Sequence, residues 1–388
     1  MIVDAPLVPS RNLPRFQAAR PLSPFLKWPG GKTLELQAIA AAAPALSGRF
    51  IDPFVGGGSV LLATPVEVPA QANDACRDLV EVYARAASGE RAFREAVDGL
   101  ADAWDELTDF DSAYADLAIA EAGPPGEAAV AIARHVERFS RALMRSGPGL
   151  AAAFGDRSAA ELHSKFNRIR RLEARRGRLS NADLLANVEG AVRASLYMAV
   201  RAQYNAARLA GRWDALRAAD FLFLREYAYA AMFRFNARDE FNVPYGGISY
   251  NRKSLGDKAR LLFGEAMLAR LATTEFHSQD FEPFLAGCDP APTDFVFVDP
   301  PYDSDFIAYD NRAFGAADQE RLEGVLATLA SKVMVVIKDA PAIRALYSLD
   351  RWHVVQAPKT YMWTIKSRND RLATHLTITN YEAGPAPG

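Results

Sequence analysis

The sequence predicts an α/β fold, in which a Rossmann-like, doubly wound parallel sheet is interrupted by a largely helical insertion. Three observations indicate this class. The segment 23–89 alternates strand-like and helix-like pieces around a Gly-rich turn. Continuous apolar runs, typical of buried parallel strands, return late in the chain at Phe295–Val298 and Val333–Ile337. Between these parts, residues 90–232 are rich in Ala, Arg and Leu and have helical periodicity.

The first α/β segment follows the order strand, turn, helix, strand, helix. Arg49–Pro53 is expected to be a buried strand that ends at the Gly-rich turn, and Val55–Ala63 to continue from that turn as a helix. A second short strand is predicted over Val66–Ala72 and a second helix over Asp78–Ala87. This order is the beginning of a doubly wound sheet.

The second α/β segment is expected to complete the same sheet. An amphipathic helix is predicted over Asp318–Leu329, between the two late apolar strands, and a last strand over Leu376–Thr379 at an edge. The expected organisation has three parts: a loose tail at 1–22, a sheet domain formed by 23–89 and 271–388, and a helical insertion at 90–270.

Composition narrows the class of protein. Half of the 388 residues are hydrophobic, which is enough for a sizeable core, and the formal net charge is −2. The cysteines, Cys76 and Cys288, are too few for a disulfide framework and lack CxxC spacing, so neither disulfides nor a metal site is expected. We find neither an apolar run of membrane-spanning length nor a secretory signal, and we expect a cytoplasmic protein.

Local clusters of positive charge lie inside the helical insertion. Four arginines, at spacings that place them on one helix face, are Arg134, Arg138, Arg141 and Arg145. A second group spans Lys165–Arg178, with Glu173 as its single acid. Each cluster is either a solvated helix face or a surface that contacts a phosphate backbone.

The first candidate site is the turn from Asp52 to Gly58, where a predicted strand ends in glycines. Gly56 and Gly58 would let the backbone pass close to a ligand. Asp74 follows about 20 residues later, just past the second strand, where an acid in a Rossmann-like unit accepts hydrogen bonds from ribose hydroxyls. A cofactor that contains a nucleoside is therefore implied. The absence of a GxGxxG pattern disfavours a dinucleotide.

The second candidate site, Asp299-Pro300-Pro301-Tyr302, directly follows the apolar strand Phe295–Val298. Ligands of open parallel sheets bind beyond the carboxyl ends of the strands, so this tetrad and the Asp52 turn are expected to line one cleft. The prolines have no N–H to donate, and their carbonyls only accept hydrogen bonds. With the Asp299 carboxylate and the Tyr302 ring, this combination suits a planar base that carries an exposed amino group.

Five motifs in order make the sequence resemble the Dam-like (alpha-group) DNA adenine-N6 methyltransferases over roughly 23–89 and 227–381. The motifs are FLKWPGGK at Phe25–Lys32, DPFVGGG at Asp52–Gly58, ND at Asn73–Asp74, RFN with FNVPYG within Arg234–Gly246, and DPPY at Asp299–Tyr302. The resemblance implies a methyltransferase sheet that binds S-adenosylmethionine, with the insertion as its target-recognition domain.

The resemblance also implies roles for single residues. The implied cofactor-binding residues are Trp28, Lys32, Asp52, Gly56, Gly58, Asp74, Phe281 and Asp299. The implied catalytic residues are Asp299, Pro300, Pro301 and Tyr302. The implied nucleic-acid-binding residues are Arg234, Asn236, Asn242 and Pro244. Lys32 is expected to meet a carboxylate of the cofactor, and Asp280-Phe281 resembles the motif on the cofactor's adenine side.

The chain departs from the family pattern at three places. Asp239-Glu240 stands where the family usually has glycine before the FN pair, and His375 stands where an acid is common. The stretch from about 90 to 232 is longer than in compact members and aligns with nothing in them. The familiar GATC target is therefore not assumed.

The expected reaction is methylation of adenine N6 in double-stranded DNA, without a metal. Hydrogen bonds from the amine to Asp299 and to the Pro300 carbonyl would localise the nitrogen lone pair, and Tyr302 would stack on an extruded base. Two alternatives stay open: another amine, such as cytosine N4 or an RNA adenine, and a catalytically silent DNA-binding relative. A restriction or defence partner also stays open.

Overall fold

The computed structural model of the chain describes residues 14–17, 21–107, 142–250, 252–301, 314–360 and 372–383. The chain divides into two compact units. The sheet unit contains Met1–Pro24, Trp28–Ala87 and Glu265–Gly388, and the helical unit contains Phe25–Lys27 and Ser88–Gly264. Each unit is described by itself below.

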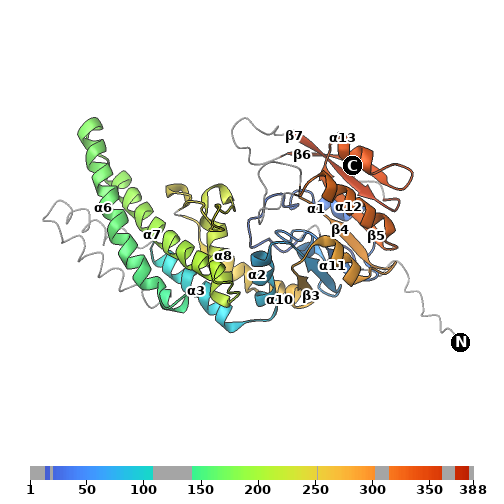
Figure 1. Ribbon diagram of the computed structural model, residues 1–388, viewed down its shortest axis with the longest axis horizontal. Coiled ribbons are helices and arrows are strands. Elements are labelled where there is room, and N and C mark those ends of the chain that lie inside the picture. The colour runs from blue at the N-terminus through green and yellow to red at the C-terminus, as the bar shows by residue number, and fades with distance from the viewer. Residues whose placement is uncertain are drawn as a thin grey trace. The chain divides into compact units, whose positions relative to one another are not determined.

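The sheet unit contains a seven-stranded sheet in the order β3-β2-β1-β4-β5-β7-β6 within the described residues (Figure 1). Its strands are β1 Phe50–Asp52, β2 Ala70–Asn73, β3 Thr274–His277, β4 Phe295–Val298, β5 Lys332–Lys338, β6 His353–Thr360 and β7 Leu372–Thr379. Neighbours from β3 to β5 are parallel, and β7 pairs antiparallel with both β5 and β6. The predicted α/β fold class is confirmed.

Helices cover the sheet in the manner of a doubly wound fold. They are α1 Leu36–Ala42, α2 Arg77–Ala87, α10 Glu265–Ala272, α11 Phe281–Cys288, α12 Ala316–Thr328 and α13 Pro341–Leu346. Alternate residues of β4, Val296 and Val298, pack in one core cluster with Leu285 of α11 and Leu322 of α12. Phe295 lies next to Val296 in the strand, so it points to the opposite face of the sheet, as the period of two requires.

The strand order places β1 beside β4. From β1 the chain proceeds to β2 and β3 on one side of the sheet, whereas β4 leads to β5 on the other side. The point between β1 and β4 is therefore the topological switch point, where open α/β sheets bind ligands beyond the carboxyl ends of the strands. Asp52 is the last residue of β1, and Asp299 directly follows β4.

The helix predicted over Val55–Ala63 is wrong. That segment forms turns and a single 3₁₀ turn, η2, at Leu61–Ala63. Gly56 and Gly58 adopt positive φ angles of 47° and 72°, which cannot continue a right-handed helix, and Pro65 follows closely on the other side. Too few residues remain between these limits for an α-helix.

Two predicted strands differ from the structure. The second strand was predicted from Val66, but β2 begins at Ala70, because Pro65 and Pro69 cannot donate hydrogen bonds to a strand ladder. The strand predicted at an edge over Leu376–Thr379 lies inside the sheet, between β5 and β6. The edge strand β6 escaped prediction because its sequence, HVVQAPKT, has no continuous apolar run and contains a proline that only an edge tolerates.

The helical unit is built from long helices around a buried one. Its elements are α3 Arg91–Glu106, α6 Leu150–Arg176, α7 Asn181–Leu209, α8 Ala215–Tyr227, η3 Tyr229–Ala231, η4 Ile248–Tyr250 and α9 Leu255–Leu262. The helix α8 is buried on all sides, as expected for a central helix. Trp104 of α3 packs against Tyr227 of α8 with ring centroids 3.8 Å apart. The described helices hold no segment long and apolar enough to cross a membrane.

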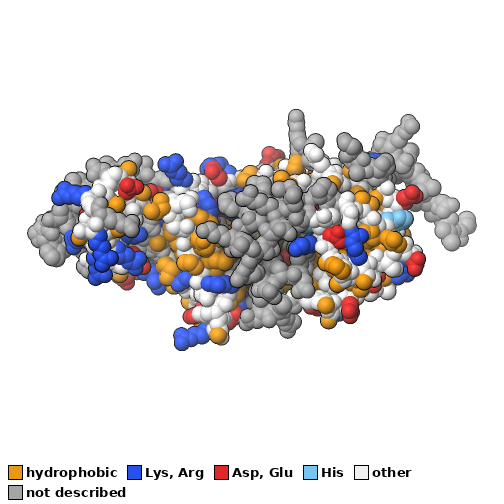
Figure 2. Space-filling model, turned by 90° about the horizontal axis from the view of Figure 1, so that it is seen from above, with side chains coloured by type: hydrophobic (Ala, Val, Ile, Leu, Met, Phe, Trp, Pro, Cys, Tyr) orange, Lys and Arg blue, Asp and Glu red, His pale blue; other side chains and the backbone are white. Residues whose placement is uncertain are grey.

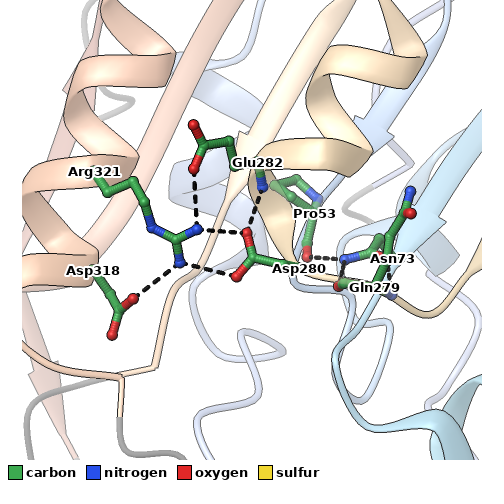
Figure 3. Close-up of polar contacts among 7 residues, drawn as sticks. All are labelled: Pro53, Asn73, Gln279, Asp280, Glu282, Asp318 and Arg321. Atoms are coloured by element: carbon green, nitrogen blue, oxygen red, sulfur yellow. Dashed lines mark hydrogen bonds and ion pairs between the residues drawn. The ribbon is translucent and has the colours of Figure 1, made fainter.

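Asn73, at the end of β2, ties three strand ends together (Figure 3). Its Nδ2 donates to the carbonyls of Pro53 after β1 and Gln279 after β3, at 3.1 and 3.0 Å. Its Oδ1 accepts from the N–H of Gln279 at 3.0 Å. The side chain is 1% exposed, so these groups have no access to water as an alternative partner.

We predict that Asn73→Ala lowers the free energy of unfolding by about 2–4 kcal/mol, because each buried group left without a partner costs about 1–3 kcal/mol. Urea unfolding followed by tryptophan fluorescence measures the change. The matched control is Gln71→Ala in the same strand, whose amide bonds the exposed Glu275 at 2.9 Å. Gln71 is only partly buried and its partner is exposed to water, so this change should cost about 0.5 kcal/mol or less. Equal losses for the two variants would contradict the role assigned to Asn73.

Candidate active site at the strand ends

Aromatic side chains contact the two glycines with positive φ angles in the Gly-rich turn after β1. A Cβ on Gly56 would lie 2.8 Å from the Trp28 ring, and a Cβ on Gly58 would lie 2.7 Å from the Tyr83 hydroxyl. Tyr83 is fully buried in α2, donates a hydrogen bond to the Gly56 carbonyl at 3.1 Å and stacks on Phe276. Both glycines are therefore required by close contacts as well as by their φ angles. Trp28 forms one wall of the turn.

Asp74 closes the same turn from the end of β2. Its Oδ2 accepts from the N–H of Gly56 at 3.0 Å, and its Oδ1 accepts from the N–H of Cys76 at 2.9 Å. Each carboxylate oxygen has a second lone pair, so Asp74 can still accept from a ligand. Burial raises the pKa of Asp74 to about 6, although the two N–H donors favour the ionised form.

Asp52 is a buried partner of this group. The side chain is 2% exposed, and its Oδ1 accepts from the N–H of Phe54 at 3.1 Å. Burial raises the pKa of Asp52 well above its ordinary value. The neighbouring carboxylates of Asp299 and Asp74 also raise this pKa, whereas the hydrogen bond from the N–H of Phe54 lowers it. Asp52 therefore stabilises the start of the Gly-rich turn through its hydrogen bond with the N–H of Phe54.

Lys32 brings a buried cation to the end of β4. Its Nζ lies 2.5 Å from Oδ1 of Asp299 and donates to the Gly30 carbonyl at 2.9 Å. The Lys32 side chain is 2% exposed, whereas that of Asp299 is 19% exposed. In this structure Lys32 pairs with the candidate catalytic carboxylate, and its contact with a cofactor carboxylate stays a prediction. The pair orients Asp299 with one oxygen toward Lys32.

The prolines after Asp299 are held by α12. Gln319, which is buried, donates its Nε2 to the Pro301 carbonyl at 3.3 Å. Pro300 is buried and Pro301 is partly buried. Asp299, Pro300 and Pro301 thus lie together at the switch point, and Tyr302 lies outside the described residues.

The pair Asp280-Phe281 begins α11 and is held by Arg321 of α12 (Figure 3). Arg321 binds both Asp280 oxygens at 2.8 and 2.9 Å and also contacts Glu282 and Asp318. Its guanidinium lies 4.4 Å from the centre of the Phe281 ring. Phe281 is 3% exposed and packs against Phe54 of the Gly-rich turn. Phe281 therefore supports the turn from within the core, and Asp280 is occupied by Arg321.

The predicted nucleic-acid-binding residues lie in the helical unit, in a hairpin that we call the target loop, Arg234–Gly246. Isolated bridges pair Phe235 with Phe241 and Ala228 with Tyr245. The backbone is anchored on α7: Asn205 binds both backbone groups of Phe241, at 2.8 and 3.1 Å. The loop therefore has a defined conformation on a helical platform.

The four predicted residues differ in what they offer to a ligand. The side chains of Arg234 and Pro244 are exposed. Asn236 is used inside the loop, because its Oδ1 accepts from the N–H groups of Arg238 and Glu240 at 2.9 and 3.0 Å. Asn242 is partly buried, and its Oδ1 has no hydrogen-bond partner among the described residues.

Comparison with known proteins identifies the family. Residues 28–115 and 179–361, more than half of the chain, match the D12 class N6 adenine-specific DNA methyltransferase family. This chain belongs to that family. The resemblance drawn from the motifs is confirmed.

Individual relatives of this D12-class chain are matched over part of their own length. The type II methyltransferase M.CviBI of Paramecium bursaria Chlorella virus NC1A is 31% identical over 42% of this chain and 61% of its own. The type II methyltransferase M1.LlaDCHI of Lactococcus lactis subsp. cremoris is 28% identical over 51% of this chain and 70% of its own. The retron Ec67 DNA adenine methylase of Escherichia coli is 33% identical over 38% of this chain and 50% of its own.

Two residues at these departures from the family pattern, Asp239 and His375, have a local partner. Asp239 adopts φ 61°, a conformation that favours glycine, and Arg208 binds its two carboxylate oxygens at 2.8 and 3.1 Å. Aspartate tolerates this conformation better than most residues. His375 is buried in β7, and its Nδ1 lies 2.8 Å from Glu35 just after the Lys32 segment. Each of the two residues is therefore held by a side-chain contact in this structure.

Sequence reasoning missed three residues that support the D12-class site: Tyr83, Gln319 and Arg321. Tyr83 and Gln319 lie in helices, where periodicity marks them only as core positions. Arg321 stands in a surface helix, and its bonds to Asp280 depend on the packing of α12 against α11. No group of three or more His, Cys, Asp or Glu that could hold a metal is present in the described part of the chain.

We predict that Asp74→Ala weakens binding of S-adenosylhomocysteine about ten- to a hundredfold, because a charged hydrogen bond is worth about 1.5–3 kcal/mol. A donor hydroxyl favours the ionised carboxylate, so binding should lower the Asp74 pKa from about 6. Affinity should therefore rise with pH until about 6 and then level off. Calorimetry across this range tests both points.

The control for the pH dependence is Asp74→Asn, which has no carboxyl group to titrate. Asp52 is present in both proteins, so a difference between their pH profiles isolates Asp74. Wild-type affinity in Asp74→Ala, or an unchanged pH profile in Asp74→Asn, would show that Asp74 does not hold the ligand.

Proposed function

We propose that this chain transfers a methyl group from S-adenosylmethionine to N6 of adenine in DNA. One observation carries the proposal: Asp299-Pro300, at the end of β4, stands across the switch point from the Gly-rich turn at the end of β1. The Lys32–Asp299 ion pair, within 2.5 Å, orients the carboxylate there. Membership of the D12 class of N6 adenine-specific DNA methyltransferases supports both the reaction and the substrate.

A methyltransferase needs a methyl donor, and the residues at the β1 and β2 ends suit S-adenosylmethionine. Asp74 can accept from ribose hydroxyls, because each of its oxygens keeps a second acceptor position. The Trp28 ring over Gly56 offers an apolar wall, and the two glycines let the backbone approach a ligand. Bound S-adenosylmethionine would supply an electrophilic methyl group.

The residues after β4 suit an exocyclic amine. A carboxylate has about four acceptor positions, so Asp299 can accept an N–H of the amine while it stays bound to Lys32. The Pro300 carbonyl, which belongs to a residue without an N–H, is the second proposed acceptor. Two such bonds would favour a pyramidal nitrogen with a localised lone pair, and the ion pair with Lys32 would hold the Asp299 carboxylate in place. A base in duplex DNA would have to leave the stack to reach these acceptors.

We assign methyl transfer to 23–89 and 271–388, and target recognition to 90–270. Within the helical unit, α6 and α7 form an antiparallel hairpin, in which Leu162 and Phe166 of α6 are buried. Figure 2 shows Lys and Arg side chains gathered at the left of the view, where this hairpin ends. The exposed arginines of this end include Arg168, Arg171, Arg175 and Arg178, and these four form no ion pair with another described residue.

The other arginine cluster gives less support. Arg134, Arg138 and Arg141 lie outside the described residues. Arg145 forms an ion pair with Asp102 of α3. The α6 end is therefore the described surface best suited to phosphate contacts.

We predict that Asp299→Ala lowers methyl transfer by about a hundredfold or more, since the variant lacks a group that stabilises the transition state. The assay measures tritiated methyl incorporation into DNA that lacks adenine methylation, with RNA as a parallel substrate. Asp350→Ala, at an exposed position of the same unit, is the matched control and should keep full activity. Near-wild-type turnover in Asp299→Ala would contradict the catalytic role of Asp299. Methyl transfer to RNA alone would show that the substrate is RNA and not DNA.

We predict that replacing Arg168, Arg171, Arg175 and Arg178 by Gln weakens binding to all duplexes alike and leaves the methylated sequence unchanged. Phosphate contacts carry no sequence information, and the log-log salt slope should fall by about 0.9 for each arginine that neutralises a phosphate in the wild type. Filter binding across a salt series measures both quantities. Arg91→Gln, which removes an exposed arginine that pairs with Glu95, is the control. An unchanged affinity and slope in the α6 variant would mean that DNA is held elsewhere.

A further inference from the structure

One continuous segment, the strap Phe25–Lys32, is divided between the two units. Phe25–Lys27 belongs to the helical unit, and Trp28 begins the next part of the sheet unit. Phe25 and Leu26 are 1% and 4% exposed, so this half of the strap is firmly packed. The peptide bond between Lys27 and Trp28 therefore joins a helical-unit anchor to the site residues that follow.

Arg225 of the buried helix α8 fastens the helical half of the strap. Its Nη2 donates to the Lys27 carbonyl, and its Nη1 donates to the Ala231 carbonyl at 3.0 Å. Arg225 is 1% exposed, so both bonds form away from water. One guanidinium thus joins the strap to the segment that leads into the target loop, Arg234–Gly246.

A second contact holds the same part of the strap. Lys27 Nζ lies 2.7 Å from Glu226, the next residue of α8, whose side chain is 6% exposed. Lys253 in turn donates to the Glu226 carbonyl at 3.2 Å. The backbone and the side chain of Lys27 are therefore both bound by consecutive residues of α8.

The segment before the target loop is strained where Arg225 binds it. Ala230 and Ala231 have φ angles of 52° and 51°, a left-handed conformation that costs alanine about 1–3 kcal/mol at each position. The Tyr250 hydroxyl accepts from the Ala230 N–H at 3.0 Å, and Arg225 holds the Ala231 carbonyl. Such a conformation persists only while its surroundings fix it. Movement of the target loop would therefore change the hydrogen bond between Arg225 and the Ala231 carbonyl.

The other half of the strap reaches the candidate active site. Trp28 lies against Gly56, and Lys32 pairs with Asp299. A displacement of Lys27 along the chain would therefore act on the wall of the Gly-rich turn and on the orientation of the Asp299 carboxylate.

We propose that Arg225 is a positioning residue that couples the target loop to the candidate active site through the strap. The inference rests on the proposed function, because the loop is taken to bind DNA and Asp299 to act on the base. Binding of DNA at the loop shifts the Ala231 carbonyl, Arg225 transmits the shift to the Lys27 carbonyl, and Trp28 and Lys32 settle in their reactive positions.

Arginine is needed for this task because its planar fork can bind two acceptors in a fixed geometry. Arg225→Lys keeps the charge but lacks the fork, so it should bind one carbonyl at a time. The matched control is Arg217→Lys in the same helix. Arg217 is also buried, lies 3.5 Å from the Trp213 ring centre and donates to the Arg212 carbonyl, and both of these partners lie outside the strap.

The test is hydrogen exchange of the strap and the target loop, with and without a short duplex that carries the methylated sequence. Single-molecule sequencing of DNA from an expressing host identifies that sequence, and finding no methylated sequence would count against the proposed function itself. In the wild type and in Arg217→Lys, DNA should slow exchange in both the loop and the strap. In Arg225→Lys, DNA should still protect the loop, while protection of the strap falls at least about fivefold.

Three outcomes would overturn the coupling while leaving the methyltransferase assignment intact. They are an unresponsive strap in the wild type, full strap protection in Arg225→Lys, and an equal loss in Arg217→Lys. If Arg225→Lys does not fold, Lys27→Met provides the second variant, because the Lys27 side chain is 41% exposed and its replacement breaks the Glu226 pair. Lys27→Met should reduce strap protection by DNA at least about twofold, and undiminished protection would refute the coupling.

Discussion

The ion pair between Lys32 and Asp299 is the interaction on which the candidate site depends. A parallel sheet brings the ends of neighbouring strands to one edge, and here that edge collects the carboxyl groups of Asp52, Asp74 and Asp299. Carboxylates that approach each other in a buried place resist ionisation, and the raised pKa of Asp52 shows this effect together with that of burial. The buried Lys32 ammonium, bonded to Asp299, offsets part of the negative charge where an acceptor of hydrogen bonds is needed.

Around this pair, the strand ends are fixed by short polar contacts. Asn73 joins the segments after β1, β2 and β3, and Asp74 holds the Gly56 backbone. Tyr83 binds the same turn from α2, and Gln319 binds the Pro301 carbonyl from α12. Each contact pairs a backbone group of the turns that would otherwise lack a partner, so together these contacts hold the turn backbones in place.

Buried arginines have a similar task elsewhere in the chain. Arg193 donates to the Trp104 carbonyl, Arg225 to the carbonyls of Lys27 and Ala231, and Arg270 to those of Pro65 and Val68. Arginine remains charged when buried, and its several N–H donors reach carbonyls that belong to different segments. The chain thus uses arginines as internal connections as well as on its surface. An arginine-rich insertion is therefore not, by composition alone, a surface for nucleic acid.

The sequence by itself determined the fold class, the two turns that carry Asp52–Gly58 and Asp299–Pro301, and the family. These features are local: apolar runs, glycines and prolines limit the backbone within a few residues. The tertiary structure decided the rest. It paired Lys32 with Asp299, engaged Asp280 with Arg321 and placed β7 inside the sheet. Those outcomes depend on residues that are distant in the chain and meet only when strands and helices pack, and no periodicity in the sequence records such meetings.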